Sequence, residues 1–342
     1  MNDQENDVRV TLEGDDGGAP RAFALGAGES VLDGLLRQGV AVPNSCRAGA
    51  CQSCLMQVTA GTPPANSQKG LKDAMRARGF FLACACVPAA DLTVRLADHA
   101  VRRARAVLRR VERLTGNVAR VLLSCDEPFE YFPGQFVNVV RADGLVRSYS
   151  LASLHSPPGV AAGDDLLELH VRKVAGGRMS TWLHDEAQDG EVIELRGPAG
   201  DCFYVPGQAE QPILLIGTGT GLAPLYAIAR DALRHGHAGP IRLYHGGLNE
   251  SGLYHVEELR QLAAAHANFE YVPCVVNAPA GPDVRIGAID KVVLADLPKL
   301  AGWRIFLCGN PDLVNALRKR VYLAGAKMSD IYADAFVMRA SA

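Results

Sequence analysis

Short runs of alternating apolar and polar residues predict a small, strand-rich domain in the first hundred residues. One helix is expected over 31–38, because Ser30 can cap its N-terminus and Gly39 can end it. Turn residues over 14–20 separate the first two strands. The remaining elements of this segment are expected as strands at 8–12, 22–25, 55–58 and 92–96, and as a second helix at 68–78.

Two other patterns follow along the chain. From about 106 to 207, short apolar runs are punctuated by pairs such as Pro133-Gly134 and Gly176-Gly177, which is typical of a compact β-barrel. From about 208 onward, strand-length runs alternate with helical patterns and indicate a parallel α/β sheet. The barrel strands are expected at 118–123, 136–140, 166–171 and 192–195, the later strands at 213–216, 241–244, 269–272 and 304–307, and the helices at 222–235, 256–265 and 311–323.

These patterns predict a multidomain chain of the α+β and α/β classes, with domains at 1–98, 106–207 and 208–342 and a linker at 99–105. Seven arginines lie between Arg95 and Arg113. We interpret this basic stretch as a solvated linker and an edge strand; the alternative is a docking surface for an acidic partner or for the first domain.

Composition narrows the class of protein. Hydrophobic residues make up 48% and charged residues 21% of the chain, as in ordinary globular proteins, and the net charge of −2 argues against general affinity for nucleic acid or anionic membranes. No apolar run reaches the length of a membrane span, and the polar N-terminus does not resemble a signal peptide. Nine cysteines without an export signal predict a reducing, cytoplasmic location.

Four of the cysteines have informative spacing. Cys46, Cys51 and Cys54 form a C-x4-C-x2-C pattern, and Cys84 follows after 29 residues. This spacing is typical of a plant-type [2Fe-2S] cluster. A zinc site would more often use two C-x2-C pairs, and only one is present. We interpret Cys86 as a buried packing thiol.

The cysteine loop resembles that of plant-type ferredoxins, C-R-x-G-x-C-G-x-C, and matches it at the three loop cysteines, Arg47 and Gly49. Gln52 departs from the pattern, where glycine is usual. The resemblance implies a β-grasp domain in which Cys46 and Cys51 hold the outer iron and Cys54 and Cys84 the inner iron.

Two motifs in the barrel segment suit a flavin nucleotide. Arg147, Tyr149 and Ser150 offer a guanidinium for phosphate, a ring for stacking and a hydroxyl. Gly176-Gly177 precedes an expected helix whose N-terminal amides can bind a pyrophosphate. Together the motifs resemble the ferredoxin–NADP reductase superfamily, which implies FAD bound to an antiparallel barrel. The residues implied at the flavin are Arg147, Tyr149, Ser150, His170, Arg172, Gly176, Gly177, Met179 and Ser180.

A glycine loop follows the first strand of the α/β segment. The sequence Gly217-Thr218-Gly219-Thr220-Gly221-Leu222-Ala223-Pro224 lacks the last glycine of G-x-G-x-x-G, because Leu222 takes its place. It matches the reductase superfamily's own loop, G-T-G-x-G-x-A-P. The resemblance implies nicotinamide-nucleotide contacts from Gly217, Thr218, Gly219, Thr220, Gly221 and Pro224.

A second site at the end of a strand completes the expected nicotinamide pocket. Cys308, Gly309 and Pro311 fit the superfamily's Cys-Gly-x-Pro turn beside the nicotinamide, and Phe336 fits the aromatic that shields the flavin. Ser150, Cys308 and Phe336 are thus the implied catalytic residues. No Arg or Lys follows the second strand over 244–250, and Glu250 would repel a 2′-phosphate, so NADH is favoured over NADPH. His235, His237 and His255 lack ligand spacing and are interpreted as surface or packing groups.

The order of the three segments resembles the reductase components of bacterial multicomponent oxygenases. That resemblance implies a monomeric oxidoreductase that passes electrons from NADH through FAD and [2Fe-2S] to an oxygenase partner. The alternatives are a reductase for a cytochrome P450 or for a deoxysugar dehydratase, and a non-catalytic redox sensor. The sensor is disfavoured because it would not need a complete hydride-transfer site.

Overall fold

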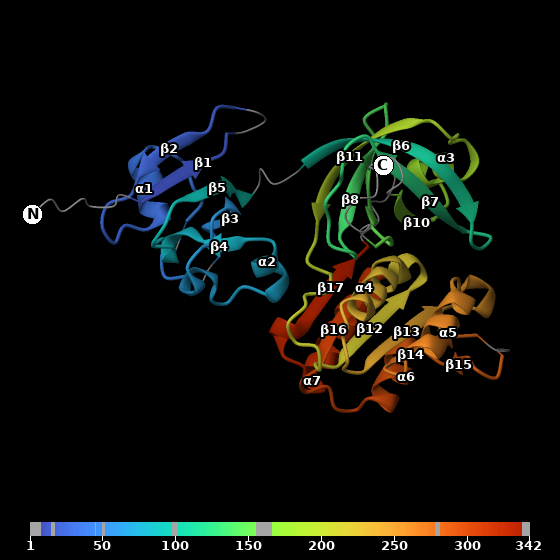
Figure 1. Ribbon diagram of the computed structural model, residues 1–342. Helices are drawn as coiled ribbons and strands as arrows, with labels where there is room; N and C mark the ends of the chain where they lie inside the picture. Colours follow the sequence, from blue (N-terminus) through green and yellow to red (C-terminus); the bar gives the residue numbers. More distant parts are fainter. Residues whose placement is uncertain are drawn as a thin grey trace, which may run out of the picture. The chain divides into compact units, whose positions relative to one another are not determined.

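The structure is a computed structural model that describes residues 8–14, 18–44, 46–49, 52–97, 102–154, 166–277 and 281–336. The chain divides into two compact units, residues 1–101 and 102–342. Figure 1 colours the first unit blue to cyan and the second green to red. Each unit has a hydrophobic core of its own.

The first unit is a five-stranded sheet with a short helix, α1 (Val31–Arg37), as expected for a β-grasp domain. The cap of α1 is as predicted, because Ser30 Oγ accepts a hydrogen bond from Asp33 N at 3.1 Å. The second and third strands of its order pair in parallel. The order is β2 (Arg21–Ala24), β1 (Arg9–Leu12), β5 (Leu92–Leu96), β3 (Leu55–Ala60) and β4 (Phe80–Leu82).

The helix predicted over 68–78 is wrong in extent. The structure has a 3-10 turn, η2 (Ala65–Gln68), and a shorter helix, α2 (Asp73–Ala77). Gly70 between them has φ 78°, a left-handed conformation that a right-handed helix cannot pass through. The periodicity of the apolar residues did not reveal this interruption.

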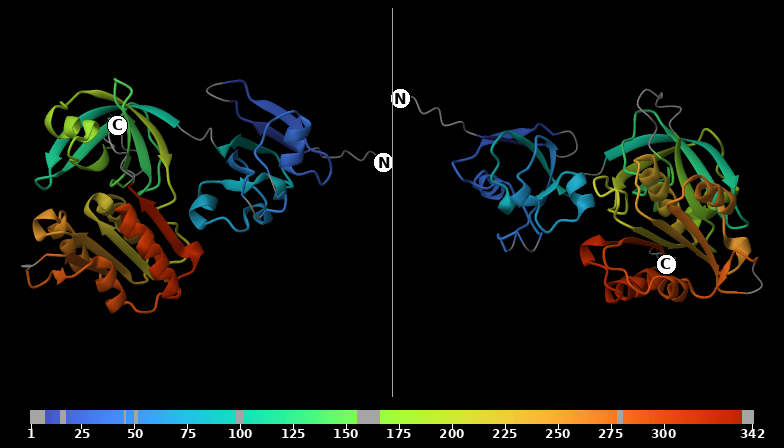
Figure 2. Two further views of the ribbon diagram at one scale, coloured as in Figure 1. Left: turned by 180° about the vertical axis from the view of Figure 1, so that it is seen from behind. Right: turned by 60° about the horizontal axis from the view of Figure 1, so that its bottom comes forward.

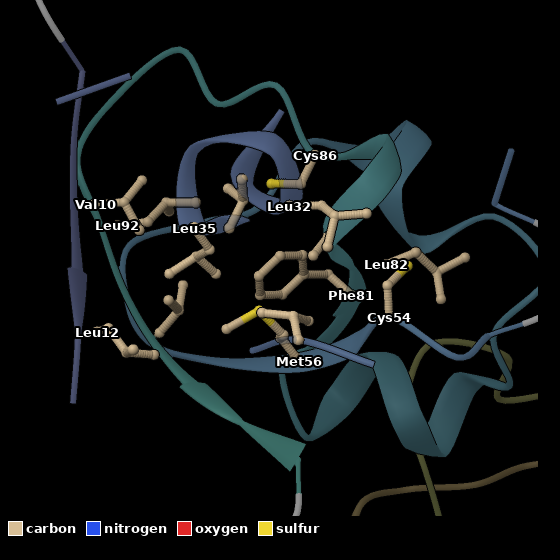
Figure 3. Close-up of a cluster of buried hydrophobic side chains, with 14 of the residues drawn as sticks. Val10, Leu12, Leu32, Leu35, Cys54, Met56, Phe81, Leu82, Cys86 and Leu92 are labelled. Atoms are coloured by element: carbon tan, nitrogen blue, oxygen red, sulfur yellow. The ribbon is translucent and has the colours of Figure 1, made fainter. Parts of the chain in front are cut away.

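The core of the first unit packs α1 against the sheet (Figure 3). Leu35 on α1 and Met56 and Phe81 on the strands are fully buried. Cys54 and Cys86 border the same cluster of side chains (Figure 3). The core therefore holds one end of the cysteine loop in place.

The second unit begins with a six-stranded antiparallel sheet and helix α3 (Arg178–Asp185). A bridge between Leu151 and Leu169 joins its two edges, so the sheet closes as the predicted barrel does. The strand order is β10 (Leu166–Arg172), β7 (Val118–Cys125), β6 (Arg102–Arg113), β11 (Val192–Ala199), β8 (Phe136–Val140) and β9 (Val146–Ser150).

The edge strand predicted in the arginine-rich stretch is wrong. Strand β6 lies inside the sheet and pairs with both β7 and β11. Ala106 and Leu108 point into the barrel core, while Arg105 and Arg109 stay on the outer face. An arginine-rich strand can be central because only its alternate residues enter the core.

The rest of the second unit is a parallel sheet with helices packed against it (Figures 1 and 2). Strand β12 lies between β13 and β16, so the chain reverses direction across the sheet there, a point at which α/β proteins bind ligands. The strand order is β15 (Arg285–Ile286), β14 (Phe269–Val275), β13 (Ile241–Gly247), β12 (Ile213–Thr218), β16 (Arg304–Gly309) and β17 (Ile331–Ala335). The helices are α4 (Leu222–Arg234), α5 (Val256–Ala265), α6 (Ile289–Asp296) and α7 (Pro311–Leu323), with 3-10 turns η5 (Gly219–Gly221), η6 (Glu250–Gly252) and η7 (Met328–Asp330).

The described helices include none with both the length and the apolar character needed to cross a membrane.

Candidate functional site

Three of the four predicted cluster ligands lie in the described part of the first unit. Cys46 is exposed in the loop after α1, Cys54 is buried just before β3, and Cys84 is half-buried in η3 (Ala83–Ala85). The thiols of Cys54 and Cys84 hydrogen-bond to each other. Cys51 lies outside the described residues. The structure therefore brings together one cysteine of the loop and the distant fourth cysteine.

The surroundings of these thiols fit an iron–sulfur cluster. Ala48 N–H points at Cys46 Sγ at 3.4 Å, the type of contact that stabilises cluster sulfur. Burial is the main cause that raises the pKa of Cys54. Cys86 is fully buried, which confirms its packing role, and burial raises its pKa to about 12. A loop that offers cysteine thiols and a backbone N–H directed at sulfur, beside an apolar core, suits a [2Fe-2S] cluster.

Gln52 occupies a left-handed position with φ 60°. Glycine reaches this conformation without the strain that a Cβ introduces, which explains why the ferredoxin pattern has glycine there. The Gln52 side chain offsets part of the strain, because Nε2 donates to Gly70 O at 3.3 Å. The departure from the family pattern therefore keeps the backbone shape of the loop.

The predicted flavin residues fall in two places on the barrel. Arg147, Tyr149 and Ser150 lie on β9, an edge of the antiparallel sheet. Gly176 and Gly177 lead into α3, as predicted, and Gly177 is its N-cap residue. Along β9 exposure falls from Arg147, which is exposed, to Ser150, which is buried. The strand thus presents a charge at one end and a hydroxyl at the other.

The turn before α3 is held by Ser180. Its Oγ accepts from Val174 N at 3.1 Å and donates to Gly177 O at 3.2 Å. A Cβ on Gly177 would lie 2.6 Å from Ser180 Oγ, whereas Gly176 faces open space at φ 69°. The residues fit an anion site because the amides at the start of the helix are left uncovered. Met179 instead packs in the barrel core, and Arg172 is exposed at the end of β10.

The glycine loop of the α/β segment packs against the turn after β16. A Cβ on Gly221 would lie 2.3 Å from Cys308 O, and one on Gly217 would lie 2.6 Å from Leu225 Cδ1. Gly309 has φ 121° and would place a Cβ 2.8 Å from Thr218 O. Gly221 and Gly309 must therefore be glycine, because the backbone of the glycine loop and that of the turn at the end of β16 lie so close together. Gly219 and Thr220 are half-exposed at the same edge of the sheet.

The barrel and the parallel sheet meet at the predicted catalytic residues. Ser150 on β9 hydrogen-bonds to Asp334 on β17, and Asp334 is the register partner of Cys308. The Cys308 thiol donates to the sulfur of Cys202. Phe336 N donates to Gly309 O at 2.8 Å. Ser150, Cys308 and the backbone of Phe336 thus lie around one junction.

Asp334 is a member of this junction that the sequence patterns did not single out. Burial raises its pKa to about 6. Burial also raises the pKa of the Cys308 thiol well above its ordinary value. The signal available in the sequence was an acid in a short apolar strand, two residues before Phe336.

His170 and His255 belong to a different, buried cluster. His170 Nε2 lies 2.8 Å from Glu168 Oε1, and its Nδ1 lies 3.1 Å from Tyr254 OH. His255 Nε2 lies 3.4 Å from His170 Nε2. His170 was expected at the flavin, but both of its ring nitrogens already face protein groups. His255 is buried, which agrees with its interpretation as a packing group, and its neighbours in the cluster come from a distant strand.

Hydrogen bonds and nearby charges within this cluster keep the Glu168 carboxylate ionised. Burial opposes ionisation of Glu168, yet hydrogen bonds from His170 and His255 hold the pKa of Glu168 well below its usual range. Burial lowers the pKa of His170. The cluster therefore pairs one carboxylate with uncharged imidazole at neutral pH.

Glu250 lies in η6, after the second strand of the parallel sheet. Its Oε2 accepts from Gly281 N at 3.0 Å, which holds this carboxylate near the loop that follows β13. Residues 244–250, which cover the end of β13 and the turn after it, contain no Arg or Lys.

Three family models match the chain in succession. They are the 2Fe-2S iron-sulfur cluster binding domain over residues 14–89, the oxidoreductase FAD-binding domain over 105–204 and the oxidoreductase NAD-binding domain over 215–319. The order of the matches follows the order of the three kinds of site described above.

Similar proteins match this chain over most of its length. The chain is 34% identical over 315 residues to the ferredoxin–NAD(P)(+) reductase component of the naphthalene 1,2-dioxygenase/salicylate 5-hydroxylase systems of Ralstonia sp., covering 90% of this chain and 94% of that protein. It is 38% identical over 302 residues to the aromatic O-demethylase reductase subunit of Amycolatopsis sp., covering 84% and 88%. Among solved structures it is similar to an Amycolatopsis cytochrome P450 reductase, with a TM-score of 0.64 and 34% identity over 96% of this chain and 98% of the other.

Proposed function

Because the chain belongs to the family of ferredoxin–NAD(P)H reductase components of multicomponent oxygenases, we propose that it is an NADH-dependent oxidoreductase that supplies electrons to an oxygenase. When bound, FAD takes a hydride from NADH and passes single electrons through the [2Fe-2S] cluster to the partner protein. The chain's own residues bind, orient and shield these groups. The domains we propose for the three tasks are 1–98, 106–207 and 208–342. The linker predicted over 99–105 is shorter than predicted, because residues 102–105 belong to strand β6 and pair with β11.

One observation carries this proposal. Ser150 on the flavin-type barrel and Cys308 on the nicotinamide-type sheet are linked through Asp334. A hydride passes only between atoms in close contact, so the two binding segments must meet at one place. The junction of these three residues supports such a meeting place, and Cys308 is buried there.

We propose that the residues recognised in the sequence hold the three groups. Arg147 would pair with phosphate, Tyr149 would stack on the flavin ring and Ser150 would hydrogen-bond it. Gly176, Gly177 and Ser180 form the turn that would bind the pyrophosphate. The nicotinamide nucleotide would be held by Gly217, Thr218, Gly219, Thr220, Gly221, Pro224, Cys308, Gly309 and Pro311, with Phe336 beside the flavin, and the cluster by Cys46, Cys51, Cys54 and Cys84.

We propose NADH as the coenzyme. Glu250 is held by Gly281 N in the loop that follows β13, where a 2′-phosphate would require a cation. The kcat/KM for NADH is expected to exceed that for NADPH by at least about tenfold, which corresponds to roughly 1.4 kcal/mol. Glu250→Gln should narrow this ratio mainly through a lower KM for NADPH. Equal constants for both coenzymes in the wild-type protein would contradict the proposal.

Two further properties belong to the proposal. We propose a monomer, and we propose a reducing cytoplasm as its location, because thiolate ligands must be available for the cluster to assemble.

A second acceptor has an observation in its favour. A solved relative with 34% identity is described as a cytochrome P450 reductase. The junction of barrel and parallel sheet would serve either acceptor, since the partner receives electrons only after they leave the cluster. Reduction of a purified P450, compared with that of a non-haem oxygenase, separates the two candidates.

The order of electron transfer is tested with Cys84→Ser. The purified wild-type protein should show flavin and iron–sulfur absorbance and should reduce both ferricyanide and cytochrome c with NADH. In Cys84→Ser, cytochrome c reduction should be lost, while ferricyanide reduction directly from the flavin remains. Cys86→Ala, two residues away, is the matched control and should keep both activities. Loss of both activities in a folded, flavin-loaded Cys84→Ser protein would contradict the order.

A further inference from the structure

Glu168, His170 and His255 form a compact group of ligand atoms that the proposed electron path does not use. Their side chains are 7%, 0% and 6% exposed. Glu168 and His170 lie on strand β10 of the barrel, whereas His255 directly precedes helix α5 of the parallel-sheet segment. Three side chains of types that bind metal ions thus meet in the interior of the second unit.

The spacing of the three atoms fits a metal ion. Glu168 Oε1 and His170 Nε2 are 2.8 Å apart, the two Nε2 atoms 3.4 Å, and His255 Nε2 and Glu168 Oε1 3.8 Å. The point equidistant from the corners of this triangle lies about 2.0 Å from each atom. Zinc binds histidine nitrogen and carboxylate oxygen at roughly 2.0–2.2 Å. The three atoms therefore surround a position of the correct size without further movement.

Hydrogen bonds satisfy part of this arrangement. A carboxylate oxygen only accepts, and each neutral imidazole carries a single proton for its two nitrogens. With His170 Nε2 protonated, its N–H can donate to Glu168 Oε1 at 2.8 Å and faces His255 Nε2 at 3.4 Å, while the two remaining acceptors, His255 Nε2 and Glu168 Oε1, lie 3.8 Å apart. A cation in place of that proton would bind all three lone pairs at once.

The outer contacts of the group also match a metal site. His170 Nδ1 lies 3.1 Å from Tyr254 OH, and the second oxygen of Glu168 accepts from Arg120 Nη2 at 3.0 Å. His255 Nδ1 lies 3.3 Å from Glu258 Oε1, although the alignment is not that of a hydrogen bond. Metal-binding histidines usually place their second nitrogen against such a partner, which leaves the first nitrogen free to bind the ion.

We propose that Glu168 Oε1, His170 Nε2 and His255 Nε2 bind one divalent transition-metal ion, zinc in the first instance. Two imidazoles and one carboxylate are ligands that zinc accepts, with water at the fourth position. The ion joins β10 of the barrel to the start of α5 and so ties the flavin-type barrel to the nicotinamide-type segment. This site is independent of the electron path proposed above.

The stoichiometry of bound zinc tests the site. Full-length holoprotein is treated with a chelator, loaded with zinc chloride and desalted, and zinc and iron are counted in the same sample by mass spectrometry. One zinc per chain is expected together with two irons, because zinc bound in the cysteine loop would displace iron. Zinc at 100 times its Kd should raise the temperature of flavin release by roughly 5–10 °C.

Variants locate the ion. Glu168→Gln and His255→Ala should each weaken zinc binding by at least about 100-fold, more than the loss of an outer contact does. His235→Ala removes an exposed histidine of α4's C-terminus and should leave both the zinc content and the thermal shift unchanged. Tyr254→Phe keeps all three ligands and should weaken binding by about 10–100-fold.

A spectroscopic measurement covers the case in which a ligand variant does not fold. Copper(II) in place of zinc can be observed by electron paramagnetic resonance, since the oxidised cluster and oxidised flavin have no unpaired electrons at low temperature. Couplings to the nitrogens of two imidazoles are expected. Fewer than two imidazoles, no zinc on the iron-replete wild-type protein, or zinc retained by both Glu168→Gln and His255→Ala would each overturn the proposal.

Discussion

The cysteine loop of the first unit and the glycine loop of the second both depend on unusual backbone conformations, but for different reasons. In the cysteine loop, two non-glycine residues are left-handed, Arg47 with φ 51° and Gln52 with φ 60°. In the glycine loop, Gly221 is needed because a Cβ would lie 2.3 Å from Cys308 O. The first loop tolerates side chains because they point outward, whereas the second has no room for one at Gly221.

This difference indicates what holds each loop in shape. Cys46, Arg47 and Gln52 are exposed, so protein packing contributes little at these positions. The glycine loop connects β12 to α4, and the hydrogen-bonded ladder between β12 and β16 pairs Gly217 with Cys308. We infer that the cysteine loop takes its stability largely from the cluster, whereas the glycine loop takes its stability from the fold.

Removing iron should produce the largest loss of stability, and this loss should be confined to the first unit. Metal bound by thiolates contributes directly to folding, so loss of the cluster is expected to lower the stability of the first unit by several kcal/mol. Limited proteolysis should then cleave within 46–54, while the temperature of flavin release from the second unit stays unchanged. An iron-free protein whose cysteine loop resists the protease as well as the holoprotein does would contradict the comparison.

The converse test is Gly221→Ala in the glycine loop. Its Cβ would overlap a backbone carbonyl that the sheet prevents from moving, so a loss of about 3 kcal/mol or more and a large rise in the KM for NADH are expected. Gly219→Ala is the control, because Gly219 has φ 55° and open space around it. It should cost only about 1 kcal/mol. Urea unfolding measures both variants, and equal losses of stability would mean that packing does not distinguish the two glycines.

The same contrast explains how much the sequence could predict. The helices over 256–265 and 311–323 and the strand over 136–140 have the predicted bounds, because their apolar periodicity matches local structure. The helix predicted over 68–78 failed at Gly70, whose left-handed φ depends on tertiary context. The edge strand in the arginine-rich stretch failed because sheet order is not encoded in one strand's own pattern.

Site residues show a similar division. Motifs that are contiguous in sequence, such as Gly217–Gly221, could be recognised without a structure. Asp334 and the partners of His255 could not, because their significance comes from contacts with residues that are distant in the sequence. A residue's type and neighbours in sequence do not reveal which distant strand will pack beside it.

Asp334 gives a pH test of burial in the second unit. Its pKa is raised by burial from 3.8 to about 6 in the folded protein, so between these values the folded state holds more protons than the unfolded state. Stability should therefore fall as pH rises from about 4 to 6, by roughly 3 kcal/mol. Asp334→Asn should flatten this slope in urea unfolding followed by flavin fluorescence. Asp283→Asn, which alters an exposed carboxylate, should leave the slope as it is, and an unchanged slope in Asp334→Asn would contradict burial as its cause.

Gln52→Gly is the mildest change and addresses the cysteine loop directly. Glycine relieves the left-handed strain at φ 60°, but it also loses the hydrogen bond to Gly70 O and adds freedom to the unfolded chain. The net effect on the first unit should be a gain of no more than about 1 kcal/mol. The rate of cluster loss under a chelator should fall only slightly. If the substitution instead accelerates cluster loss several-fold, the contact between Gln52 and Gly70 holds the loop more strongly than the iron does, and the distinction drawn between the two loops is incorrect.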